Sequence, residues 1–175
     1  MTALPHLSGS EAILVLTKLL AAHPELRDKA ETIAREAVET IPAGLAEQLR
    51  TSIMELNVES LSGRTGYQPG QGWVEPYDVA DEILDEVVEP FLADAVRRAK
   101  AGAADAAVTM SLDIIKGLYL LPIPTELDST VLYSFCGEDS AHQRAQLLME
   151  RLRKAGATLP ESELAGVAPD WFELT

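Results

Sequence analysis

The chain has 175 residues, of which 47% are hydrophobic and 24% charged, a composition that suits one globular domain with a sizeable core. Lys and Arg number 14 against 28 Asp and Glu, so the formal net charge is −14. A chain this acidic repels phosphate backbones and anionic lipid surfaces, and we therefore expect neither a nucleic acid nor a membrane as its partner. A protein partner or self-association remains compatible with this charge.

Cysteine usage and the start of the chain bear on the compartment. Cys136 is the only cysteine, so an intramolecular disulfide is impossible, as is usual in a reducing compartment. The first residues lack the positively charged and apolar regions of a signal peptide, and no uncharged apolar run has the length of a membrane span. We expect a soluble, cytoplasmic protein.

The small share of aromatic residues, 5%, predicts a core made of Leu, Ile, Val and Ala, which favours helix-on-helix packing. The sequence predicts one all-α domain over residues 1–175, with six or seven helices in antiparallel pairs. A helical bundle and a short α-solenoid both fit this pattern.

Three short helices are predicted first. Ser8 and Glu11 have the spacing of a capping box, which predicts a helix that begins at Ser8 and stops near His23. Pro24 fits the first turn of a second helix, which ends at Ile41 and Pro42. A third helix is expected over residues 43–56, because apolar residues recur there at helical spacing.

Residues 60–77 break the helical pattern. This stretch holds four glycines, two prolines and three aromatic residues, which predicts a long, self-packed loop without a helix. Loops of this length in compact domains are more often functional than accidental.

The remaining elements follow from strong periodicity. A long helix is expected over residues 78–101, with Pro90 kinking or dividing it. A very apolar helix over residues 103–121 should be central in the fold. A short helix near residues 128–135, an amphipathic helix over residues 140–155 and a C-terminal tail over residues 157–175 complete the chain.

An acidic ladder begins the long helix, with like charges spaced three and four residues apart. Two such carboxylates could hold a divalent cation or form an acid–base pair, whereas the structural interpretation is a solvated helix face, which we favour. The ladder consists of Asp78, Asp81, Glu82, Asp85, Glu86 and Glu89.

No catalytic or metal-binding constellation emerges elsewhere. The three histidines are scattered, so zinc ligation has no support. Cys136 and His142 could form a nucleophilic pair, but Cys136 is better interpreted as a small core residue. We expect no catalytic residue, no metal and no cofactor.

The loop offers the candidate site. Arg64 could clamp an anionic ligand or a peptide carboxylate. In the structural interpretation, which we favour, it pairs with Asp78 or Glu75 or caps backbone carbonyls of the loop. The aromatic residues of the loop either form a binding surface or fold inward as a small core of its own. These residues are Tyr67, Trp73 and Tyr77.

The loop and the elements after it resemble a known family. The matching positions are Leu61-x-x-Arg64-x-Gly66-x-x-Pro69-Gly70-x-Gly72-Trp73-Val74-x-Pro76, then Ala80-x-x-Ile83-Leu84-x-Glu86-x-Val88-x-Pro90-Phe91, Gly102-x-x-x-Ala106-Ala107 and Gly117-Leu118-Tyr119. Over about residues 20–155 the chain resembles a family of bacterial, notably actinobacterial, helical proteins of uncharacterised function. The resemblance implies an all-helical, HEAT-like domain and carries over no catalytic residue.

These observations predict a non-enzymatic protein-interaction module. Its contact surface would be the loop residues Arg64, Tyr67, Trp73 and Tyr77, flanked by the acidic face of Asp81, Asp85 and Glu89. The alternative is an enzyme or small-ligand-binding protein that uses an anion site at Arg64 with nearby carboxylates.

Overall fold

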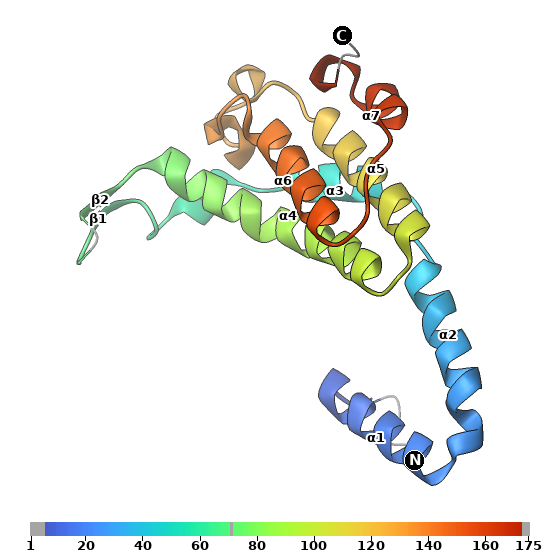
Figure 1. Cartoon of the computed structure of the whole chain (residues 1–175). Coiled ribbons are helices and arrows are strands. Elements are labelled where there is room, and N and C mark those ends of the chain that lie inside the picture. The colour runs from blue at the N-terminus through green and yellow to red at the C-terminus, as the bar shows by residue number, and fades with distance from the viewer. Residues whose placement is uncertain (1–5, 71, 173–175) are drawn as a thin grey trace. The chain divides into compact units, whose positions relative to one another are not determined.

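The computed structural model describes residues 6–70 and 72–172, and over these residues the chain is all-α, as predicted. Within this described part, the regular elements are seven α-helices and one two-stranded hairpin, apart from short 3₁₀ turns (Figure 1). The chain divides into two compact units, residues 1–39 and residues 40–175, and each is described by itself.

The first unit contains α1 (Gly9–Ala22), a 3₁₀ turn at Pro24–Leu26 and α2 (Arg27–Glu39). The predicted capping box is present: the Ser8 hydroxyl accepts from the Glu11 amide, and the Glu11 carboxylate accepts from the Ser8 amide at 2.8 Å. No residue of α1 or α2 is buried. These helices therefore gain little from packing within their own unit.

The second unit carries the hydrophobic core of the described residues. Its helices are α3 (Leu45–Met54), α4 (Pro76–Lys100), α5 (Ala104–Tyr119), α6 (Ser140–Lys154) and α7 (Glu161–Val167). Helix α5 packs against α3, α4, α6 and α7, which confirms that the very apolar helix predicted over residues 103–121 is central. Its buried face includes Met110, Ile114, Ile115 and Leu118.

Residues 58–77 are more regular than the sequence predicts. A 3₁₀ turn at Val58–Leu61 is followed by strands β1 (Gly66–Gln68) and β2 (Gly72–Val74), which pair antiparallel. Gly70, which lies between the strands, has a φ of 90°, a conformation that favours glycine. In Figure 1 the hairpin projects beyond the N-terminal end of α4. The expected self-packed loop is thus a projecting β-hairpin.

Helix α4 continues through Pro90 from Pro76 to Lys100, so the expected division of this helix does not occur. Pro90 lies on the exposed side, where its ring meets solvent, while Val88 and Leu92 on either side of it are buried. Burial of the apolar face therefore keeps the helix whole despite the missing amide donor.

The C-terminal segment packs onto the core. Helix α7 lies against α5, and a 3₁₀ turn at Pro169–Trp171 follows it. The Tyr119 hydroxyl donates to Asp170 at 2.8 Å, and the Trp171 ring meets Tyr119 edge-on and stacks with His142. These contacts hold residues 169–171 against α5 and α6.

Candidate functional site

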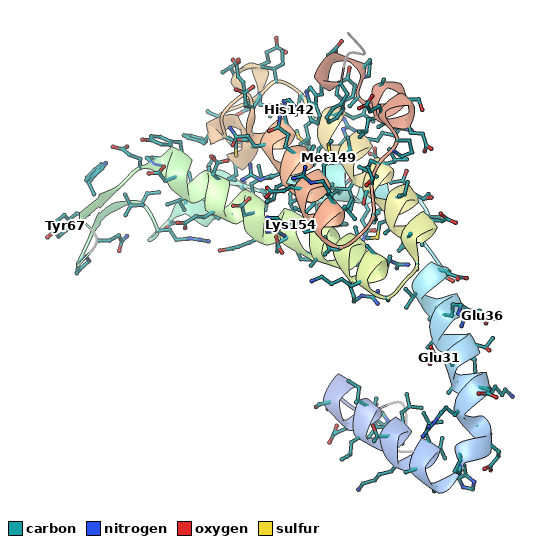
Figure 2. The ribbon with its side chains drawn as sticks, viewed as in Figure 1. Glu31, Glu36, Tyr67, His142, Met149 and Lys154 are labelled. Carbon is teal, nitrogen blue, oxygen red and sulfur yellow. The ribbon has the colours of Figure 1, made fainter. Side chains whose placement is uncertain are left out.

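The hairpin presents two aromatic side chains on one face. Tyr67 in β1 and Trp73 in β2 are register partners, and directly opposed residues of an antiparallel pair point to the same side. Tyr67 is 75% exposed and Trp73 67% exposed, while the strand residues on either side of each are half-buried. Figure 2 shows Tyr67 pointing away from the helices of its unit. We call the Tyr67–Trp73 pair the aromatic hairpin face.

Tyr77 extends this exposed aromatic character to the first turn of α4, where it is 56% exposed. Large aromatic side chains usually bury most of their surface, so three exposed ones within eleven residues are a departure from ordinary surface composition. They do not form the inward-folded core that was the alternative expectation for this stretch.

Arg64 fastens the segment before the hairpin to α4. Its Nη2 lies 2.9 Å from Glu86 Oε1 and 3.3 Å from Glu82 Oε2, and Nη1 donates to Glu86 as well. The hydrogen bond and the charge of Glu86 raise the pKa of Arg64. A structural ion pair, as we favoured, is present, but its partners are neither Glu75 nor Asp78: Glu82 and Glu86 lie one and two turns beyond Asp78 along α4.

The opposite edge of the acidic ladder is held by Arg144 of α6, a buried cation that the sequence analysis did not single out. Its Nη2 lies 2.8 Å from Asp85 Oδ1 and 3.2 Å from Asp81 Oδ1, and it donates to the Asp81 carbonyl at 2.9 Å. The Ser140 hydroxyl donates to the same Asp81 carboxylate, and the Ser140 carbonyl accepts from Arg144 Nη1. Asp81 and Asp85, predicted as partner-binding residues, are thus engaged within the fold.

Five of the six ladder carboxylates pair with cations from outside α4, and most of them also stay exposed, so the ladder is both a solvated face and a contact with neighbouring elements. Besides these pairs, Arg151 of α6 lies 2.7 Å from Glu89. The sequence does indicate the burial of Arg144, because helical spacing places it on the same face as Ala141, Ala145 and Leu148, which faces the core. A cation on an apolar stripe is expected to be buried and paired.

Cys136 and His142 do not make a nucleophilic site. Cys136 is buried, and desolvation raises the pKa of its thiol to about 12, so the thiol stays protonated at neutral pH. The His142 ring stacks with Trp171, and its Nε2 lies 3.2 Å from the side-chain nitrogen of Gln146, within hydrogen-bond distance. Within the described residues there is no group of three or more His, Cys, Asp or Glu that could hold a metal ion.

A groove of about 630 Å³ runs between the C-terminal halves of α4 and α6. Its floor is apolar at Ala93, Val96 and Ala155, and its rim is charged. Most of the rim cations are compensated, since Arg97 pairs with Asp94, Arg151 with Glu89 and Lys154 with Glu150. Lys154 sits near the end of α6 in Figure 2. Because these cations are already paired, the groove attracts an anion only weakly.

Comparison of the chain with protein-family models, curated proteins and solved structures finds no match. The family resemblance stated from the sequence motifs stays a prediction. Across residues 6–70 and 72–172, no helix combines the length and apolar character that crossing a membrane requires.

Proposed function

We propose that the chain is a non-enzymatic protein-interaction module that binds its partner through the aromatic hairpin face. The observation that carries the proposal is the position of Tyr67 and Trp73, which are register partners on one side of the hairpin and both mostly exposed. Tyr and Trp are enriched at the energetic centres of protein interfaces, because each buries a large rigid surface at low cost in side-chain entropy.

The charge around this face supports a cationic partner segment. Glu75 follows β2 directly, Asp78 lies in the first turn of α4, and the whole chain carries a net charge of −14. A Lys- or Arg-rich segment gains cation–π contact with the exposed rings and long-range attraction to the carboxylates. Arg64 enters this surface indirectly, because its pairing with Glu82 and Glu86 orients the base of the hairpin.

The alternative function, an enzyme or small-ligand site at Arg64, has weaker support. An incoming anion would have to displace Glu82 and Glu86 from the guanidinium group and would then meet their negative charge. A cytoplasmic setting belongs to the same proposal, supported by the single, unpaired thiol of Cys136.

The test is a display screen of random peptides against the full-length protein. We expect enriched peptides to be rich in Lys and Arg, to lose about tenfold or more in affinity for Trp73→Ala, and to weaken with added salt, because truncating a central aromatic residue costs about 1.4 kcal/mol or more. Leu120→Ala is the matched control, since Leu120 is 49% exposed on the same unit but lies after α5. Enrichment that is equal for wild type and Trp73→Ala would refute the assignment of this face.

A folding control accompanies the screen. Because Trp73 is mostly exposed, Trp73→Ala should leave the free energy of unfolding within about 0.5 kcal/mol of wild type. A loss of binding that accompanies a large loss of stability would instead mean that the aromatic pair is structural.

A further inference from the structure

The first unit leaves apolar helical surface uncovered. Exposed apolar side chains on α1 include Ile13, Leu14, Val15, Leu16 and Leu19, and Ile33 of α2 is 56% exposed. A helix pair that buries no residue of its helices has too little packing energy to be stable alone, because isolated helices of this length are marginal in water. The pair therefore needs an apolar surface supplied from outside itself.

The small net charge of the first unit favours a partner surface that is itself nearly neutral. Residues 1–39 carry four cations and six anions, a net charge of −2, so residues 40–175 carry the other −12. Two copies of this chain would repel strongly through their second units and only weakly through their first units. The opposite charges are also interleaved along α2, which leaves no cationic face for anionic lipid.

The order of residues along α2 is self-complementary. Leu26, the last residue of the 3₁₀ turn before α2, and Ala30, Ile33 and Ala37 of α2 follow the 4-3-4 spacing of a heptad stripe. When a second copy of α2 runs antiparallel about a two-fold axis centred between Ala30 and Ile33, Leu26 meets Ala37 and Ala30 meets Ile33. Each layer then joins a large side chain to a small one, so the helices approach closely and the layers interdigitate.

The flanking charges select the same register. Lys29 and Glu36 lie on one flank of the stripe, the cation nearer the start of α2 and the anion nearer its end. A two-fold axis brings equivalent flanks together, so Lys29 of one copy lies opposite Glu36 of the other, and this pair occurs twice. In a parallel arrangement, Lys29 would lie level with Lys29 of the other copy and Glu36 level with Glu36, so this complementary pair would not form. Figure 2 shows Glu31 and Glu36 projecting from α2.

We propose that this protein forms a homodimer through its first unit, with two α2 helices packed antiparallel along the stripe Leu26, Ala30, Ile33 and Ala37. Helix α1 of each copy adds its own exposed apolar side chains to the surface that the dimer can bury. The dimer presents two aromatic hairpin faces, one on each copy. A bivalent partner thereby gains avidity over a single site.

The first measurement is the mass of the full-length protein by multi-angle light scattering over a range of concentrations. We expect twice the chain mass for wild type and for Leu120→Asp, a control on the second unit, and a dimer weakened about tenfold or more by Ile33→Asp. A cooperative thermal unfolding transition, which reports the packed core, would verify that each variant keeps its second unit folded. A wild type that stays monomeric at tens of micromolar overturns the proposal, as does an Ile33→Asp variant that dimerises like wild type.

The second measurement tests the register by charge complementation. Lys29→Glu and Glu36→Lys each place like charges opposite one another in their own homodimer. A mixture of the two variants restores opposite charges at both ends of the contact, because the two introduced side chains meet at one end and the two unchanged ones at the other. We expect each variant alone to dimerise more weakly than wild type and the mixture to recover dimers that contain one copy of each.

If the mixture gives no preference for the mixed dimer, the antiparallel α2 contact is overturned. Loss of peptide binding by Trp73→Ala has no bearing on this result, so the two proposals fail separately.

Discussion

Gly117 of α5 lies directly against the backbone of Ala46 in α3. A Cβ placed on Gly117 would stand 2.6 Å from the Ala46 carbonyl oxygen and 3.1 Å from the Ala46 Cα. Both atoms belong to a helix backbone, which moves much less easily than a side chain. The crossing of α3 over the central helix therefore depends on the missing side chain at this glycine, which is itself buried.

Gly117→Ala should destabilise the protein although alanine is the better helix former. The gain in helix propensity is about 1 kcal/mol, whereas forcing α3 and α5 apart costs about 1–3 kcal/mol and disturbs the packing of Leu49 and Ile53, which face the core. Chemical denaturation of the two proteins gives the difference. Gly166→Ala in α7 is the matched control, because a Cβ there meets nothing within 4 Å, and it should be neutral or stabilising. Equal stability of Gly117→Ala and wild type would show that α3 moves freely.

Replacement of Arg144 should cost far more than replacement of Arg64. Arg144 is buried, forms ion pairs with Asp81 and Asp85, and donates hydrogen bonds to the Asp81 carboxylate and to two backbone carbonyls. Arg144→Met therefore leaves these acceptors without their cation at the α4–α6 contact. Asp81 and Asp85 keep partial access to water, which limits the loss to about 2–3 kcal/mol.

Arg64→Ala removes an ion pair that is open to solvent, and such pairs contribute about 0–1 kcal/mol. Urea midpoints of the two variants test the ranking, and a cost for Arg64→Ala that matched Arg144→Met would contradict it. Raising the salt concentration should reduce the effect of Arg64→Ala and leave most of the effect of Arg144→Met.

Alkaline pH should destabilise the fold through two buried acids. Burial raises the pKa of the Cys136 thiol from 9.0 to about 12 and the pKa of the Tyr133 hydroxyl from 10.0 to about 12. Because the folded pKa values lie above the unfolded ones, these groups leave stability unaffected below about pH 9. Above it the unfolded state releases protons first, so stability falls until pH reaches about 12.

Urea denaturation at several values between about pH 8 and pH 11 measures this decline. Cys136→Ala should make the decline shallower above about pH 9, whatever it costs at neutral pH through the lost side chain. A thiol reagent at about pH 8 should react with the native protein only at the rate of its opening. Rapid labelling of the native thiol would contradict the burial of Cys136.

Deletion of residues 1–39 should leave the second unit folded. All the buried residues of the described chain lie between Leu45 and Ala168, so the deletion removes no core side chain. The melting temperature of residues 40–175, compared with that of the Ile33→Asp full-length chain, should differ by only a few degrees. Loss of cooperative unfolding in the shortened chain would show that the first unit is required for the core.

The sequence alone was sufficient for the all-α class, the central position of residues 103–121 and the capping box at Ser8, which the structure confirms. Each of these depends on periodicity or on contacts between residues close in the chain. The hairpin was missed because its strands have three residues each, too few for an alternating pattern to stand out from a glycine-rich stretch.

Tertiary structure decided which charges meet. The partners of Arg64 are 18 and 22 residues away, and Arg144 reaches Asp81 across 63 residues, so only the packing of α6 and the hairpin base against α4 selects them. Burial of the apolar face likewise kept α4 whole through Pro90. Local patterns therefore specified the helices, because their hydrogen bonds are local. The ion pairs and the exposure of Tyr67 and Trp73 followed from the folded arrangement, because charge pairing and solvent access depend on neighbours that are distant in the sequence.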